Sequence, residues 1–166
     1  METTKKPVSP KAVASKIKKS KDIKYYEAVG RRKEAVARVR LYLTSKEKVA
    51  NVFDQKIKKG EIIVNKKPIA TYFSSQAEKN IYLLPLKLTN SEDRFAVSII
   101  VRGGGHVGGL EAIVHGLARA LEKVDRENYR PILKKAGLLK RDARERERRK
   151  VGTGGKARRV KQSPKR

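Results

Sequence analysis

The chain has 166 residues, of which 43 are Lys or Arg and 17 are Asp or Glu, so its formal net charge is +26 at pH 7. It contains no Cys, which excludes a disulfide framework and thiolate metal sites. It also lacks the long apolar run that a membrane span or a signal peptide requires. This composition predicts one modest domain with basic extensions in a reducing, soluble compartment. The large excess of cations predicts a polyanionic partner such as nucleic acid.

The charge pattern divides the chain into three predicted parts. Residues 1–24 carry eight Lys and predict a flexible basic arm; Glu2 and Asp22 disfavour a mitochondrial transit peptide. Residues 25–139 contain the apolar periodicities and predict the globular domain. Residues 140–166 carry 13 Lys or Arg against three acidic residues, with very few aliphatic side chains. Such a tail cannot bury enough apolar surface to fold alone, so we expect an extended segment that a polyanion orders.

The first strong structural pattern is the alternation of residues 35–43. One set of side chains is apolar, whereas the other set includes Arg38, Arg40 and Tyr42. Alternation with a period of two predicts a strand with one face on a core and one basic face that ends in an aromatic residue.

A short strand over residues 24–29 is predicted to precede it. Residues 30–33 would form the connecting turn, in which Gly30 permits the tight bend and three cations, Arg31, Arg32 and Lys33, gather at the tip. Adjacent like charges repel unless a partner neutralises them, so this tip is predicted to clamp phosphate; a solvated hairpin tip is the alternative.

The middle of the chain gives weaker signals. Residues 44–60 read as an inserted loop with a short helical turn near residues 49–53. Residues 61–64 predict a strand. The capping-box spacing at residues 75–78 predicts a helix over residues 76–84, which Pro85 would end. A strong strand follows, with its apolar face formed by Phe95, Val97, Ile99 and Val101.

Residues 103–109, GGGHVGG, open a predicted helix whose apolar stripe runs from Leu110 to Val124. The glycines match the GxGxxG pattern of dinucleotide sites after a strand and before a helix. That reading also needs a following parallel strand with an acidic residue, whereas a second helix over residues 127–136 follows, capped by Asp125 or Asn128 and stopped at Gly137. The glycine run is therefore predicted to let the backbone approach a polyanion closely.

Glu111, His115 and Arg119 recur one turn apart on this helix and are predicted to form a polar face opposite its apolar stripe. With His106 they raise the alternative of a zinc site, but the set lacks a well-placed third ligand. Hydrogen bonding to phosphate or ribose suits the face better. Nothing in the sequence supports catalysis or a cofactor, because no Ser lies in a nucleophile context and the carboxylates are interleaved with cations.

Several ordered segments resemble the family of the ninth protein of the small ribosomal subunit, bacterial type. They are GRRKEAVARV at residues 30–39, VNKKP at 64–68, VRGGGHVGG at 101–109, HGLARAL at 115–121, and LKKAGLLKRDARERERRKVG at 133–152, with the terminal Lys165 and Arg166. The resemblance implies an α+β fold, with helices packed on a mixed four-stranded sheet in two layers, like the second domain of ribosomal protein S5. It also implies a place in the head of the small subunit, in the cytoplasm. Expected partners are small-subunit ribosomal RNA, neighbouring head proteins and peptidyl-site transfer RNA.

These arguments together give a set of predicted RNA-binding residues, namely Arg31, Arg32, Lys33, Arg38, Arg40, Arg102, Gly103, Gly104, Gly105, His115, Arg119, Arg141, Arg144, Arg148, Arg149, Lys150, Lys156, Arg158 and Arg159. The resemblance adds Lys165 and Arg166 as the residues expected to contact transfer RNA. A general nucleic-acid-compacting protein is the alternative function, because it would explain the charge, although it leaves the order of strand, glycine run and helix unexplained. A nucleotide-dependent enzyme would explain the glycines alone.

Overall fold

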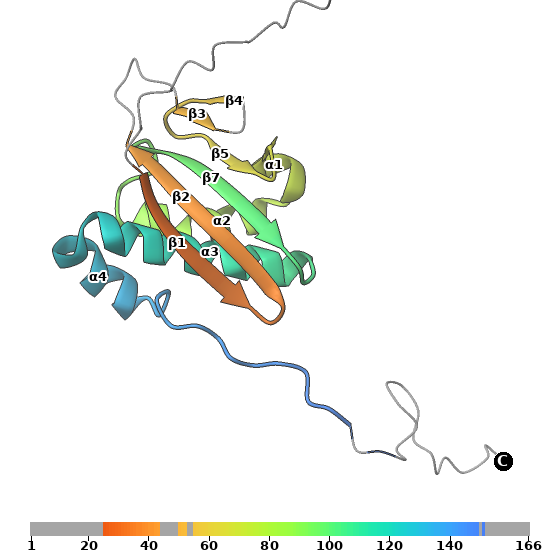
Figure 1. Cartoon of the computed structure of the whole chain (residues 1–166). Helices are drawn as coiled ribbons and strands as arrows, with labels where there is room; N and C mark the ends of the chain where they lie inside the picture. Colours follow the sequence, from red (N-terminus) through yellow and green to blue (C-terminus); the bar gives the residue numbers. More distant parts are fainter. Residues whose placement is uncertain (1–24, 44–49, 53–54, 150, 152–166) are drawn as a thin grey trace, which may run out of the picture.

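The computed structural model describes residues 25–43, 50–52, 55–149 and 151 (Figure 1). Within these residues the chain forms, in order, β1 (Tyr25–Arg32), β2 (Ala35–Leu43), β3 (Ala50–Val52), β4 (Gln55–Ile57), β5 (Ile62–Val64), β6 (Lys67–Pro68), α1 (Ile69–Tyr72), α2 (Gln76–Leu88), β7 (Phe95–Arg102), α3 (His106–Val124) and α4 (Arg126–Lys135). The predicted amino-terminal arm, most of the insert before β3 and the end of the tail lie outside the described residues.

The main sheet has the order β1-β2-β7-β5-β6. β1 pairs antiparallel with β2, β2 with β7, and β5 with β6, whereas β5 runs parallel to β7. The predicted α+β class with a mixed sheet is therefore confirmed. β6 adds a two-residue edge strand to the four main strands that were expected.

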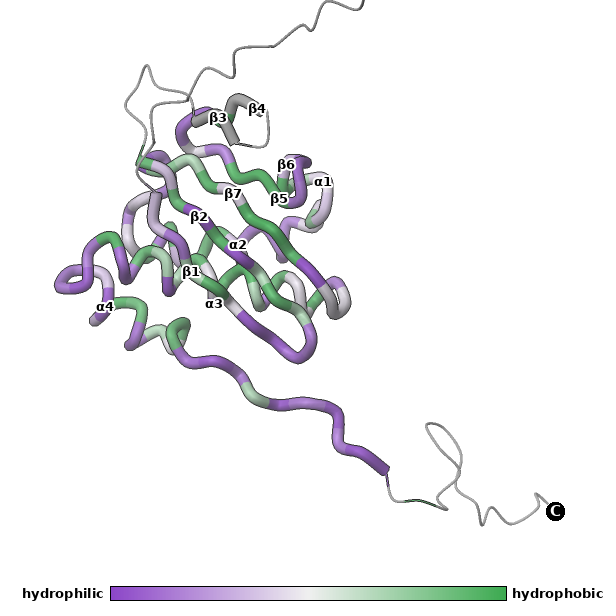
Figure 2. The backbone as a smooth tube through the Cα atoms, viewed as in Figure 1, coloured by the Kyte–Doolittle hydropathy of each residue, from purple (hydrophilic) through white to green (hydrophobic). Residues whose placement is uncertain are grey.

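The core lies between this sheet and the helices, which cover one of its faces (Figure 1). The predicted alternation of β2 is confirmed as far as Leu41, because its inward side chains are fully buried: Ala35, Ala37, Val39 and Leu41. Leu43, which was expected on the same face, is exposed. They meet the apolar stripe of α3, where Ile113, Leu117 and Leu121 have no exposed surface. Figure 2 shows hydrophobic colour on the sheet and on the helix behind it. Each Val, Leu or Ile side chain buried in this layer contributes about 1.5–3 kcal/mol.

Among the described residues, the opposite face of the sheet has a second apolar cluster next to the β3–β4 hairpin. There Tyr42 packs with Ile57, Ile63 and Ala96 in a second, smaller cluster. The expected helical turn in this insert is wrong, since residues 50–52 form β3 and pair antiparallel with β4. Pairing with a neighbouring segment decided the structure where the local sequence had no clear period.

The start of α2 agrees with the sequence prediction, whereas its end does not. The predicted capping box of α2 is present, with the Ser75 amide donating to Glu78 Oε2 at 3.4 Å. The prediction that Pro85 ends this helix is wrong, because α2 continues to Leu88. Pro85 and Leu86 are buried, and Thr89 Oγ1 donates to both of their carbonyl oxygens. The Thr89 hydroxyl thus satisfies carbonyl groups in the last turn of the helix, while burial of the Pro85 ring favours its place within α2.

The short α4 positions the start of the tail. Asp125 Oδ1 accepts from the Asn128 amide at 3.1 Å, so Asp125 is the cap. At the other end Gly137 has φ +73°, and the Leu138 amide donates to Leu133 O in the pattern of a Schellman motif. Leu138 and Leu139 then pack against the core. The chain is thus held to the domain up to the point where its basic tail begins.

Among the described helices, none is both long and apolar enough to cross a membrane.

Candidate nucleic-acid interface

The β1–β2 hairpin separates the cations that the sequence was expected to bring together. β1 extends to Arg32, so the turn consists of Lys33 and Glu34, and Lys33 takes the positive φ of 49°. Because successive strand residues point to opposite faces, Arg31 is exposed while Arg32 is buried. The prediction of three cations at the tip is therefore wrong in its geometry. Only Lys33 lies in the turn itself.

Arg32 has the largest set of polar contacts described in this region, and only 8% of its side chain is exposed. Its Nε donates to Glu111 Oε2 at 2.5 Å, and its Nη1 donates to the carbonyl oxygen of Arg144 at 2.6 Å. Its Nη2 lies 3.0 Å from Asp142 Oδ2. A buried guanidinium requires such partners, since an unpaired buried charge is strongly destabilising. This residue, predicted to bind phosphate, is thus engaged by α3 and by the tail.

The glycine run packs against the same hairpin. A methyl group on Gly103 would lie 2.7 Å from the carbonyl oxygen of Glu34, and one on Gly104 would lie 2.7 Å from Cβ of Ala35. Both glycines have φ +69°. In contrast, a methyl group on Gly105 would have no neighbour within 4 Å. The first two glycines therefore fit β7 to the turn, and Gly105 is the one with free space beside it.

The open face of the sheet carries further cations. Arg38 and Arg40 are half-buried on β2, and Arg102 is exposed on β7, where it pairs with Val36. Arg40 Nε donates to Glu27 Oε2 at 2.6 Å, and its guanidinium lies 4.9 Å from the Tyr25 ring centroid. The hydrogen bond to Glu27 raises the pKa of Arg40, against the opposing effect of burial.

The polar residues of α3 contact β1. The Arg31 amide donates to His115 Nδ1 at 3.3 Å, and Arg119 Nη1 donates to Val29 O at 2.5 Å. One turn further along, Lys123 Nζ donates to Glu27 O at 2.7 Å. Burial and then the charge of Arg119 lower the pKa of His115, so its ring is neutral at pH 7. The expected polar face of this helix therefore lies along the edge strand of the sheet.

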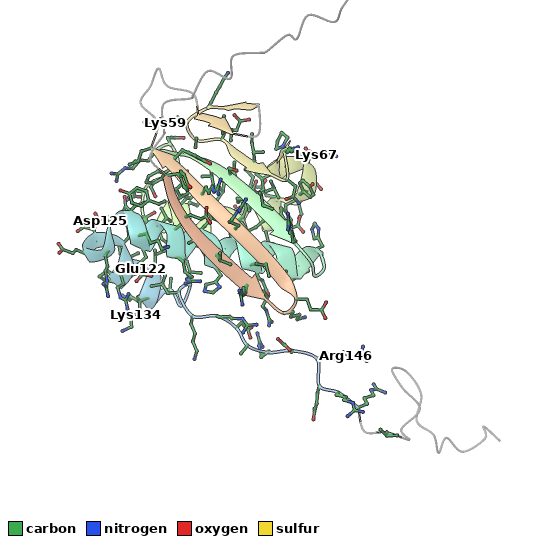
Figure 3. The ribbon with its side chains drawn as sticks, in the orientation of Figure 1. Lys59, Lys67, Glu122, Asp125, Lys134 and Arg146 are labelled. Atoms are coloured by element: carbon green, nitrogen blue, oxygen red, sulfur yellow. The ribbon has the colours of Figure 1, made fainter. Side chains whose placement is uncertain are left out.

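Not every predicted residue is brought into this region. Arg141, Arg148 and Arg149 lie in the segment 140–149, which runs away from α4 past the hairpin (Figure 1). Arg144 lies in the same segment, but its carbonyl oxygen contacts Arg32. Figure 2 shows that segment as hydrophilic almost throughout, and Figure 3 places Arg146 far from Asp125 and Glu122 at the other end of the domain. The predicted residues Lys150, Lys156, Arg158, Arg159, Lys165 and Arg166 lie outside the described part of the chain.

The alternative chemistries find no support in the geometry. His106 Nε2 lies 2.5 Å from Glu78 Oε1, and its ring is 4.8 Å from that of Phe73, so an α2 carboxylate and an aromatic ring hold it. The described residues contain no group of three His, Cys, Asp or Glu that could hold a metal ion. In the described segment after α3 the chain continues as α4 and the tail, without the parallel strand that a dinucleotide fold requires.

Sequence reasoning missed three contact residues: Glu27, Lys123 and Asp142. It placed Glu111 on the polar face of α3 but did not identify Arg32 as its partner. The sequence did contain a signal for the buried position of Arg32. Ala28, Gly30 and Arg32 are two residues apart on β1, so their side chains face the same side of the sheet, toward the core. No signal of this kind marked Asp142, since its partner Arg32 lies far away in the sequence.

Comparisons with known proteins agree with one another. A sequence model of the family described as ribosomal protein S9/S16 matches residues 30–166. The small ribosomal subunit protein uS9 of Maridesulfovibrio salexigens is 44% identical over 136 residues, which cover 82% of this chain and 92% of that relative. The family model covers the last residues of β1 together with β2, the glycine run, α3 and the tail.

Proposed function

The chain belongs to the ribosomal protein S9/S16 family and is a structural constituent of the small ribosomal subunit; from this premise we propose that it binds ribosomal RNA through the hairpin end of its domain and through its basic tail. The expected family and a location in the bacterial cytoplasmic ribosome follow from the same matches. The predicted division into arm, domain and tail, and the prediction that the protein is not an enzyme, stay part of the proposal.

One observation carries the proposal: cations from distant parts of the sequence meet at one end of the molecule. One cavity is lined by Lys33 and Glu34 of the β1–β2 turn, by Gly104 and Gly105 of the glycine run, and by Arg146 with its neighbour Glu145. Two carboxylates balance the two cations of this lining, so the positive excess comes from the cations around it. Arg31 and Arg102 are exposed close by on the sheet. Clustered Arg and Lys attract phosphates and release condensed counterions, and a backbone without side chains lets phosphate approach closely.

The individual residues contribute in different ways. We assign direct phosphate contacts to the exposed cations Lys33, Arg102, Arg141 and Arg148. Arg31, Arg38 and the tail cations that lie outside the described residues remain expected contacts. His115 and Arg119 are already bonded to β1, so any contact with ribose must use the remaining surface of these side chains. Contact between Lys165, Arg166 and the peptidyl-site transfer RNA is the part of the proposal that rests on the family resemblance.

The test compares the full chain with a chain that ends at Leu139. The shortened chain should keep its circular dichroism spectrum, because the apolar residues of the core all precede the cut. It should bind transcribed small-subunit ribosomal RNA far more weakly and leave the small-subunit fraction of a sucrose gradient at moderate salt. Equal binding of both chains would contradict a role of the tail. Equal affinity of the full chain for duplex DNA would favour the nucleic-acid-compacting alternative.

A further inference from the structure

The strongest unexplained feature is the contact between the buried Arg32 and the first residues of the tail. If residues 140–149 were only a solvated cationic segment, nothing would require them to touch the domain. Instead Asp142 and Arg144 supply two of the three acceptors around the Arg32 guanidinium, and Glu111 of α3 supplies the third. Arg32 lies on β1 and its partners come from α3 and the tail, so the contact ties three segments together.

The tail is shaped locally to make this contact. Asp142 Oδ1 accepts from the Arg144 amide at 2.9 Å, and Asp142 Oδ2 accepts from Arg144 Nη2 at 2.7 Å. These hydrogen bonds hold residues 142–144 in the local conformation in which the Arg144 carbonyl oxygen contacts Arg32. The hydrogen bonds from Arg144 hold the pKa of Asp142 well below its usual range, because they favour the ionised carboxylate. The positive charges of Arg144 and Arg32 act in the same direction.

The segment before the turn is fixed as well. The Schellman motif at Gly137 ends α4, and Leu138 and Leu139 pack on the core immediately afterwards. Between Leu139 and Arg144 the chain is therefore held at both ends, first by apolar burial and then by Arg32. A segment held at two points leaves the domain in a defined direction, in contrast to a tail attached at one point.

We propose that Arg32 is a positioning residue: with Glu111 and Asp142 it docks the start of the tail on the domain in the absence of RNA and sets the direction in which the remaining cations leave. The proposal rests on the proposed function, because positioning matters only if the tail binds RNA. A tail that is already aimed loses less conformational freedom when it binds, and this raises affinity without any additional contact.

The first test measures the position of the tail directly, in the full chain without RNA. The protein has no Cys, so the substitutions Glu34→Cys and Glu147→Cys allow one spin label to be attached at each of these two positions. Pulsed electron paramagnetic resonance then gives the distribution of distances between the two labels. Arg32→Met and Asp142→Ala should broaden this distribution. Arg31→Met removes the same charge from the adjacent, exposed residue and should leave it narrow. A distribution that is unchanged in Arg32→Met or in Asp142→Ala would overturn the proposal.

The Asp142→Ala variant is expected to fold even if Arg32→Met does not, since Asp142 follows every described helix and strand of the domain. Circular dichroism of each variant checks that the domain is intact. If Arg32→Met unfolds, the distance distribution of Asp142→Ala alone decides.

The second test uses RNA affinity, where positioning and simple electrostatics predict opposite signs. Removing the carboxylate of Asp142 makes the tail more cationic, so electrostatics alone predicts tighter binding to transcribed small-subunit ribosomal RNA. Loss of positioning predicts binding weaker by about three- to tenfold. Glu147→Ala is the matched control, because it removes the same charge from the same segment at a residue outside the Arg32 contact. It should bind slightly more tightly than the wild type.

Tighter binding of both Asp142→Ala and Glu147→Ala would overturn the proposal while leaving RNA binding intact. A wild-type chain that does not bind this RNA at low salt would contradict the proposed function instead. In that case the distance distributions still decide whether Arg32 docks the tail.

Discussion

Gly30 of β1 and Gly116 of α3 lie in backbone contact where the helix crosses the edge strand. A methyl group on Gly30 would lie 2.3 Å from the backbone nitrogen of Gly116 and 2.0 Å from the carbonyl oxygen of Ala112. The sequence suggested that Gly30 served a tight turn, but the turn begins three residues later, at Lys33. The absence of a side chain at Gly30 is what lets α3 approach β1, so that its polar side chains reach the backbone of that strand.

This contact predicts the effect of a single methyl group. Gly30→Ala should reduce the free energy of unfolding by roughly 2–3 kcal/mol or more, because the clash involves backbone atoms that cannot move away easily. Gly105→Ala is the control, since its added methyl group meets nothing within 4 Å. Urea unfolding followed by circular dichroism measures both variants. Equal stability of Gly30→Ala and the wild type would show that the helix can shift without cost.

A second prediction concerns the edge strand. Arg119 donates to Val29 O and Lys123 to Glu27 O, and these carbonyl groups point away from β2. Arg119→Met should therefore lower the free energy of unfolding by about 1 kcal/mol, the typical worth of such a hydrogen bond at the surface. Lys79→Met on α2 removes an exposed cation that makes no side-chain contact of this kind and should change stability much less. Chemical denaturation of both variants makes the comparison, and equal losses would count against a specific role for the edge.

The protein should lose stability as the pH falls below the ordinary pKa of histidine. Burial lowers the pKa of His115 in the folded state, so the unfolded chain takes up a proton first. The stabilisation is fully present above about pH 6.5 and is lost as the pH falls toward the folded-state pKa. Protonation of Nδ1 would also remove the acceptor for the Arg31 amide.

Melting temperatures between pH 7 and pH 5 test this dependence. His115→Gln keeps a polar side chain that does not titrate, so its melting temperature should change less over the same range. An equally steep decline in the variant would assign the pH dependence to other groups. Asp142, whose pKa is also lowered, acts only at much lower pH, because its stabilising effect disappears as the pH falls below about 4.

RNA affinity should depend steeply on salt. If the hairpin end and the tail neutralise about six to ten phosphates, the affinity should fall by roughly three to five orders of magnitude between about 50 and 200 mM salt. Filter binding or fluorescence anisotropy with transcribed small-subunit ribosomal RNA measures the slope. A chain ending at Leu139 should show a clearly shallower slope, because it lacks the 13 cations that follow. A flat response of the full chain would rule out phosphate contacts as the main source of affinity.

The final prediction addresses the last two residues. Deleting Lys165 and Arg166 should leave assembly of the small subunit intact and weaken peptidyl-site transfer RNA binding several-fold, on the order of 1 kcal/mol. Added salt should reduce the difference, because it screens exposed charges. Transfer RNA binding to purified mutant and wild-type subunits measures the effect. If mutant and wild-type subunits bound transfer RNA with equal affinity at low salt, the proposed contact of Lys165 and Arg166 with transfer RNA would be wrong.

The sequence by itself determined the elements whose pattern is strong and local. The alternation of β2, the apolar stripe of α3, the capping box at Ser75 and the helix stop at Gly137 were all predicted and confirmed. The reason is that a period of two or 3.6 residues and the chemistry of a helix end depend on near neighbours in the chain. Net charge and the ordered family motifs identified the ribosomal family in the same way, without any knowledge of contacts.

Only the tertiary structure decided what covers each face. Period two separates Arg31 from Arg32, but only the packing of α3 and the tail shows that Arg32 is enclosed by Glu111 and Asp142. The same applies to Pro85, which burial keeps within α2. Polar partners that are distant in sequence leave no periodic signal. Burial of Arg32 is tolerated because folding brings its carboxylate partners next to it, and a buried charge without partners would be destabilising.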